Sequence, residues 1–391
     1  MSVTNDPWAE RFSLSQFTSR QAFLQDVSLC LELGIPAIEV CANKLSDNPG
    51  VARDQLRALR DSGLSVSSVQ ARVHSVFPDQ MAPRPLEPEA RCDAFLRAMD
   101  LVAENLRDEH PAFVLISGQA PGHDIARARD VLTRAAARLA REAAARGASI
   151  AFEPLHPVMM NTDSFVWSWE EALALAATVA HPAFGLVCDL WNVWDQPGIV
   201  ARVQETIARV RLVHASDWRD GGPHRLNDRL VPGRGAIPFP AWGRMLRDSG
   251  YSGWVCLEML SDESLADSYL HEPVGRVVDE SRRHLRATDC LHAADKGRAA
   301  RDVPASPPAP PKRREPAAPI PIRMEILRLK IRNLPNAAGN GHLEKALEAV
   351  PHVQSVEIVA ECGEAIINHD GVDHVQLKRA LSGLGYVGET D

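Results

Sequence analysis

Short apolar runs alternate with longer stretches of helical periodicity through most of the chain. Eight runs have the length and branched-residue content of buried strands, at 11–17, 35–40, 64–73, 112–118, 148–155, 184–190, 210–217 and 253–259. Helical patterns separate them, most clearly over 126–147 and 169–180. Several strands follow a glycine, the usual helix stop signal: Gly34, Gly63, Gly147 and Gly250. About eight β–α alternations in roughly 280 residues predict an α/β fold, a parallel (β/α)8 barrel, with a doubly wound open sheet as the alternative.

A composition change divides the chain. Residues 296–322 form a linker that is crowded with Pro and Ala from residue 302 onward and has no hydrophobic period. The linker separates a large unit, 1–295, from a small one, 323–391. The small unit reads as strand, helix, strand, strand, helix and a short last strand, which predicts a ferredoxin-like βαββαβ sandwich.

Composition and charge exclude several classes of protein. The 391 residues carry a formal net charge of −8, which argues against a general nucleic-acid binder. No run approaches the roughly 18 apolar residues of a membrane span, and the first residues lack the regions of a signal peptide. The seven cysteines are scattered without a CxxC pair, so we expect them to be reduced. These features predict a cytoplasmic protein that binds neither nucleic acid nor membrane.

Strongly ligating side chains stand at the ends of the last four strands of the large unit. Glu153 ends the fifth, Asp189 the sixth and Glu258 the eighth, while the seventh carries His214 and Asp217. In a parallel barrel these ends meet at one mouth, where catalytic groups lie. Three carboxylates beside one imidazole repel each other unless a cation sits among them. Separate salt bridges to nearby Arg or Lys residues are the alternative.

The predicted ligands limit which metal ions the site can bind. Three oxygen donors and one nitrogen suit a divalent ion, with Mn²⁺ expected first and Mg²⁺, Co²⁺ or Zn²⁺ as alternatives. Cys188 and Cys256 lie just before ligand positions. Strand alternation predicts that Cys188 points away from the barrel interior and Cys256 into it.

Four motifs, FEPLHP, VCDLWNVWDQP, VHASDWRD and RLVPGRGAIPFPAWGRMLRDSGYSGWVCLEM, resemble the sugar phosphate isomerase/epimerase family of xylose isomerase-like TIM barrels. The resemblance covers about 10–290. It implies that Glu153, Asp189, His214 and Glu258 hold one metal ion, and that Glu153 and Glu258 are also the acid and base. The implied activity is isomerisation or epimerisation of a sugar or sugar phosphate by proton transfer through a metal-stabilised enediolate. A dehydratase or lyase acting on a keto-sugar or polyol, and a non-catalytic binding or scaffold protein, are the alternatives.

Three positions depart from the family pattern. Asn192 stands where many members have a histidine, three residues after the aspartate ligand. Asp220 stands where many have an arginine, six residues after the histidine ligand. Arg234 occupies the middle of a GxG turn that often holds an acidic residue. The pattern therefore differs from that of the usual ketose 3-epimerase.

The predicted substrate contacts surround these positions. Aromatic faces suit the C–H face of a sugar, and polar groups can reach its hydroxyls or a phosphate. On these grounds the residues predicted to contact substrate are His156, Asn192, Trp191, Trp218, Arg219, Arg72, His74 and Arg234. Ordinary loop packing and solvated surface arginines are the competing interpretation. The loop over 218–237 is also expected to close over the substrate as a lid.

The small unit resembles a heavy-metal-associated domain in LKIRNLP, HLEKALEAVPHVQSVEIV, GEAIINHD and LKRALSGLGY. Members bind soft metal through a CxxC motif, but here Asn336 and Gly339 stand at those positions. Because Cu(I) needs the two thiolates, copper transfer is not expected. Docking of a protein partner or homo-oligomerisation is the expected role.

Overall fold

The computed structural model describes residues 11–106, 110–221 and 224–291, and in the C-terminal part residues 325–332, 341–350, 353–359, 364–369, 377, 380–382, 384 and 386–390. The predicted linker and both predicted domain boundaries lie outside these residues. The described residues belong to two units, each with its own hydrophobic core.

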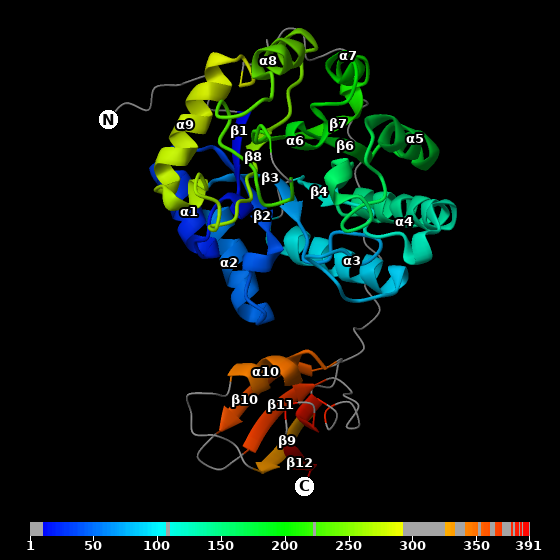
Figure 1. Ribbon diagram of the computed structural model, residues 1–391, viewed down its shortest axis with the longest axis vertical. Coiled ribbons are helices and arrows are strands. Elements are labelled where there is room, and N and C mark those ends of the chain that lie inside the picture. Colours follow the sequence, from blue (N-terminus) through cyan, green and yellow to red (C-terminus); the bar gives the residue numbers. More distant parts are fainter. Residues whose placement is uncertain are drawn as a thin grey trace. The chain divides into compact units, whose positions relative to one another are not determined.

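The larger unit is a closed barrel of eight parallel strands with helices around it (Figure 1). Strands follow one another around the barrel in chain order, which confirms the predicted (β/α)8 barrel and excludes the open sheet. The strands are β1 (Phe12–Ser15), β2 (Ala37–Cys41), β3 (Ser65–Gln70), β4 (Ala112–Leu115), β5 (Ser149–Phe152), β6 (Phe184–Asp189), β7 (Val210–Ala215) and β8 (Val255–Leu257).

The helices of the barrel begin and end on local signals. Side chains of Asn48, Asp124 and Ser168 accept hydrogen bonds from the first turns of α2, α4 and α5. The four glycines predicted as helix stops all have positive φ. The helices are α1 (Phe23–Glu32), α2 (Pro49–Asp61), α3 (Pro88–Asn105), α4 (Ile125–Ala145), α5 (Trp169–Val179), α6 (Leu190–Val193), α7 (Ile199–Glu205), α8 (Phe239–Asp248) and α9 (Val274–Ala287). No helix among the described residues is long and apolar enough to cross a bilayer.

The core of the barrel has two parts. Apolar side chains fill the space between strands and helices, and Cys188 belongs to this outer cluster. A smaller inner cluster fills the barrel interior and includes Cys256. The opposite orientations predicted for the two cysteines are therefore confirmed.

Two register shifts set which residues face each other at the mouth. Between β6 and β7 the pairing skips Arg211, so that Asp189 lies opposite His214. Between β2 and β3 it skips Ser67, so that Glu39 lies opposite Ser68. Such irregularities re-aim side chains next to functional sites.

The described part of the smaller unit is an antiparallel sheet in the order β10–β11–β9–β12, with a helix over 341–348 and further helical residues at 377 and 380–382. Its elements are β9 (Glu325–Arg332), α10 (Gly341–Glu348), β10 (Val353–Val359), β11 (Glu364–His369) and β12 (Val387–Thr390). Most of the second predicted helix lies outside the described residues, as do Asn336 and Gly339. The ferredoxin-like fold and the heavy-metal-associated resemblance therefore stay predictions.

Candidate metal centre

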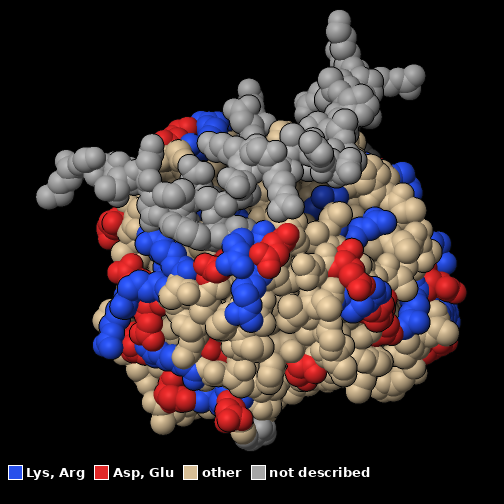
Figure 2. Space-filling model, turned by 90° about the horizontal axis from the view of Figure 1, so that it is seen from above, with Lys and Arg blue, Asp and Glu red and all other residues tan. Residues whose placement is uncertain are grey.

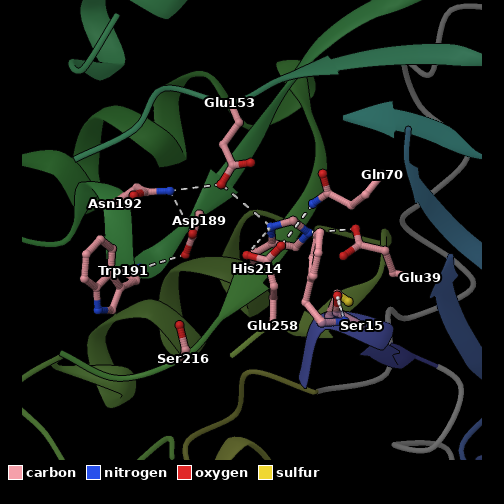
Figure 3. A network of polar contacts seen from close by, with 12 residues as sticks. Ser15, Glu39, Gln70, Glu153, Asp189, Trp191, Asn192, His214, Ser216 and Glu258 are labelled. Atoms are coloured by element: carbon pink, nitrogen blue, oxygen red, sulfur yellow. Dashed lines mark hydrogen bonds and ion pairs between the residues drawn. The ribbon is translucent and has the colours of Figure 1, made fainter. Parts of the chain in front are cut away.

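The structure brings the four predicted ligands together at the carboxyl ends of consecutive strands. Glu153 follows β5, Asp189 ends β6, His214 lies in β7 and Glu258 follows β8. One donor atom from each lies within 4.8 Å of the others, and all four residues are buried. Figure 3 shows the carboxylates of Glu153, Asp189 and Glu258 gathered around the His214 ring. The cluster can therefore hold a divalent ion.

The two ring nitrogens of His214 have different partners. Nε2 lies 3.0 Å from Oε2 of Glu39. Nδ1 lies 3.4 Å from Oε2 of Glu258 and 3.8 Å from Oε1 of Glu153, yet this buried atom has no hydrogen-bond partner among the described residues. A buried nitrogen without a partner that faces carboxylates fits a metal ligand.

Burial and mutual charge shift the pKa values of the cluster in different directions. Burial raises the pKa of Glu153 to about 7, and it also raises that of Asp189. Burial acts the same way on Glu258, but His214 and Arg229 outweigh it and lower the pKa of Glu258 to about 2. Burial disfavours the charged form of His214, but Glu258 and Glu39 raise its pKa well above the ordinary value. The cluster thus attracts positive charge.

Two amide side chains fix the carboxylates in place. Nδ2 of Asn192 donates to Oε1 of Glu153 at 2.9 Å and to Oδ2 of Asp189 at 2.8 Å. Gln70, which sequence reasoning missed, donates to Oε1 of Glu258 at 3.0 Å. Asn192, predicted to contact substrate, thus orients two of the proposed ligands.

Arg229 enters the cluster from the loop between β7 and α8. Its Nη1 atom lies 2.9 Å from Oδ2 of Asp189 and 3.0 Å from Oε2 of Glu258, and its guanidinium lies over the ring of Trp191. Sequence reasoning looked for an arginine six residues after His214 and found Asp220. Arg229 stands 15 residues after His214, and the fold of the loop brings it to the cluster.

Asp217 holds this loop in shape. Its buried carboxylate accepts hydrogen bonds from the backbone amides of Trp218, Gly233, Gly235 and Ile237, at 2.8–3.0 Å. A Cβ at position 235 would lie 2.2 Å from the carbonyl oxygen of Trp218, so only glycine fits there. Asp217 is therefore a structural residue of the loop that carries Arg229.

A small cavity of about 50 Å³ opens onto the cluster. Glu153 and Glu258 line it, whereas Asp189 and His214 do not. The other polar lining residues are Gln70, His74, Asp163 and Arg229, and the apolar ones are Phe17, Met81, Ile116, Leu155, Met159, Leu226 and Leu260. Leu226 and Arg229 of this lining lie on the loop that is expected to close as a lid, so movement of that loop would change access to the cavity.

The predicted aromatic contacts pack against each other beside the cluster. The ring of Trp218 lies 4.7 Å from that of Trp191 and 4.5 Å from that of His156, measured between centroids. His156 also faces Asp195, with Nε2 3.2 Å from the carboxylate. None of these residues lines the described cavity, so their contact with substrate stays a prediction.

The three remaining predicted arginines are held in ion pairs away from the cluster. Arg72 pairs with Asp47 and Arg219 with Asp267. Arg234 pairs with both Glu272 and Glu280. On the face in Figure 2, basic and acidic side chains are intermixed in the same way. Of the predicted polar contacts, His74 is the one that lines the cavity.

A closed barrel with clustered ligands at the ends of β5 to β8 defines a TIM-barrel protein with a candidate metal centre. The family model of xylose isomerase-like TIM barrels matches residues 27–288, and the chain belongs to this family. This family includes isomerases, epimerases and dehydratases.

Solved structures share the barrel. Protein SMc04130 from Sinorhizobium meliloti 1021 is 25% identical, with a TM-score of 0.61 over 72% of this chain and 98% of its own. The IolI protein, solved with a bound zinc atom, is 17% identical, with a TM-score of 0.57 over 71% and 98%. D-psicose 3-epimerase from Clostridium cellulolyticum H10, solved with D-tagatose, is 17% identical, with a TM-score of 0.53 over 71% and 96%. The last two likenesses concern the fold alone. No curated protein matches the sequence significantly.

Proposed function

We propose that the protein is a divalent-metal-dependent isomerase or epimerase of a small sugar. One observation carries this proposal: four ligating side chains form one buried cluster, and two of them, Glu153 and Glu258, also face a cavity. A purely structural cluster has no need of an opening onto its carboxylates. The named sugar isomers in the D-psicose 3-epimerase structure support the same class of reaction.

Glu153, Asp189, His214 and Glu258 would hold the ion, with Nδ1 of His214 as the nitrogen donor. A divalent ion polarises a ketone and an adjacent hydroxyl, which acidifies the C–H bond between them. The donor set favours Mn²⁺, and the zinc atom in the IolI structure supports Zn²⁺ as the alternative.

The protein side chains supply proton transfer and orientation. Glu153 and Glu258 line the cavity, and we assign them the proton transfer. One would remove the proton from a carbon, and the other would return a proton to the opposite face of that carbon in an epimerase; an isomerase would return it to the neighbouring carbon. Arg229 and His74 line the same cavity, where they can donate hydrogen bonds to substrate oxygens. Gln70 and Asn192 keep the carboxylates oriented.

The charge of the site favours an uncharged sugar over a sugar phosphate. The buried carboxylates of Glu39, Glu153, Asp189 and Glu258 face Arg229 and a divalent ion, which leaves the site slightly negative when His214 is neutral. The arginines predicted for phosphate binding are engaged in ion pairs. A phosphate group would therefore meet net repulsion and no unengaged arginine among those predicted.

The test is incubation of the metal-loaded protein with matched pairs of free and phosphorylated ketoses in D₂O. We expect deuterium to appear at a carbinol carbon of a free ketose, detected by NMR, and Glu258→Gln to abolish it. Glu142→Gln, a change on the exposed face of α4, is the matched control and should keep full activity.

The outcomes separate the alternatives. Loss of water from the substrate would identify a dehydratase, and turnover of phosphorylated ketoses alone would contradict the uncharged substrate. Absence of exchange or elimination with every sugar and metal tested would contradict the proposed enzyme class.

A further inference from the structure

We propose that Glu39 is a positioning residue of the metal centre: its carboxylate holds the imidazole of His214 in the orientation and tautomer that leave Nδ1 available to the ion. Glu39 lies in β2, separated from β7 by β8 and β1 around the barrel. No motif of the sequence pointed to it. The inference rests on the metal-binding part of the proposed function and is independent of the substrate.

The contact between Glu39 and His214 determines where the imidazole proton lies. Oε2 of Glu39 and Nε2 of His214 are 3.0 Å apart, and both residues are fully buried. A carboxylate can only accept a hydrogen bond, so Nε2 must carry the proton. In the neutral ring Nδ1 then has a free lone pair, and it faces Glu153 and Glu258 on the other side of the ring (Figure 3).

The barrel is shaped to hold Glu39 at this point. The register shift between β2 and β3 places Ser68 opposite Glu39, and its hydroxyl donates to Oε2 at 2.6 Å. Ser68 and His214 thus bind the same oxygen. Oε1 of Glu39 has no hydrogen-bond partner among the described residues. A buried carboxylate with one unsatisfied oxygen costs free energy, so packing alone does not explain its presence.

A carboxylate behind a histidine ligand has a defined effect on the metal. It fixes the ring and makes the ligating nitrogen more basic, and losing it typically weakens metal binding about 10- to 100-fold. The amide of glutamine keeps the shape of Glu39 but removes the charge. Glu39→Gln should therefore weaken metal binding while the barrel stays folded.

The experiment is isothermal titration of the metal-free full-length protein with Mn²⁺ and with Zn²⁺. We expect Glu39→Gln to bind about 10- to 100-fold more weakly than the wild type. Ser68→Ala removes the hydroxyl that donates to the Glu39 carboxylate, so we expect a smaller loss of metal affinity. If Glu39→Gln does not fold, Ser68→Ala serves as the test in its place. The matched control is Asp26→Asn, a second buried carboxylate in the barrel unit, whose partners are Lys44, Gln16 and Ser19 rather than His214. Its metal affinity should be unchanged.

A spectroscopic measurement tests the tautomer directly. In Zn²⁺-loaded protein labelled with ¹⁵N-histidine, we expect His214 to carry its proton on Nε2 and the metal on Nδ1. Metal on Nε2, or two ions per chain with Glu39 and Cys256 as additional ligands, would overturn the proposal. Equal affinities of the wild type and Glu39→Gln would do the same.

The failure of this inference can be told from failure of the proposed function. If the wild type binds metal tightly and Glu39→Gln binds it equally well, only the proposed role of Glu39 is contradicted. Wild-type protein that binds no divalent ion contradicts both the role of Glu39 and the metal-dependent enzyme.

Discussion

Arg229 places a permanent positive charge against two of the carboxylates proposed to hold the ion. Its side chain is only 2% exposed, and one nitrogen atom contacts both Asp189 and Glu258. In the metal-free protein this guanidinium offsets part of the buried negative charge. In a metal-loaded protein it would lie beside the cation. We therefore expect Arg229 to stabilise the metal-free fold and to lower the affinity for metal.

Replacing Arg229 with methionine separates these effects. Removing one partner of a buried ion pair typically destabilises a protein by about 3–5 kcal/mol. We expect a loss of this size in the metal-free protein by chemical denaturation, together with tighter Mn²⁺ binding and reduced turnover. Arg219→Met, which breaks the pair of Arg219 with the exposed Asp267, should change stability by less than about 1 kcal/mol. Weaker metal binding by Arg229→Met would contradict this interpretation.

The proposed metal ligands could be read from the sequence because each signal is local. A charged residue at the end of an apolar strand is visible without any knowledge of the neighbouring strands, as with Glu153 and Glu258. Glu39 was not found because its role depends on a register shift and on a residue three strands away. The contact of Arg229 with Asp189 and Glu258 was not predicted, because the path of a long loop, rather than a fixed spacing from His214, brings this residue to the cluster.

The loop between β7 and α8 is the element that completes the site. Asp217 at its start binds four backbone amides of the loop, and Leu226 and Arg229 reach the cavity from its middle. The two ends of the loop are thus held together by Asp217, while its middle segment lines the cavity. The sequence analysis predicts a lid over 218–237, and the movement of this loop stays a prediction.

Asp217→Asn tests whether Asp217 holds the two ends of the loop together. An amide keeps one acceptor oxygen, so some of the four backbone donors lose their partner, at about 1–3 kcal/mol for each one left unsatisfied. We expect faster proteolysis within 218–237 and a lower kcat/KM, with one metal ion per chain retained. Limited proteolysis and metal analysis check this. A variant with unchanged proteolysis would show that Asp217 does not hold the loop.

On the scale of the whole molecule, the barrel gathers more negative than positive charge at its mouth. Four strands contribute the proposed ligands and a fifth contributes Glu39, so the repulsion acts across much of the barrel. A bound cation relieves this repulsion. Metal binding and global stability should therefore be linked.

Metal removal should lower the melting temperature of the protein. A ligand that binds only the folded state at 100 times its Kd adds about 2.7 kcal/mol, which corresponds to several degrees for a barrel of this size. Scanning calorimetry with EDTA and with added Mn²⁺ measures the difference. The Glu258→Gln variant should respond less to Mn²⁺ than the wild type. Identical melting curves with and without metal would argue against a metal site in the barrel.

The most direct test of the central claim is anomalous diffraction from crystals loaded with Mn²⁺. We expect one strong anomalous peak per chain, enclosed by the carboxylates of Glu153, Asp189 and Glu258 and by Nδ1 of His214. A barrel without a peak at this position, or with the four side chains turned away from a peak elsewhere, would contradict the claim that these residues share one ion.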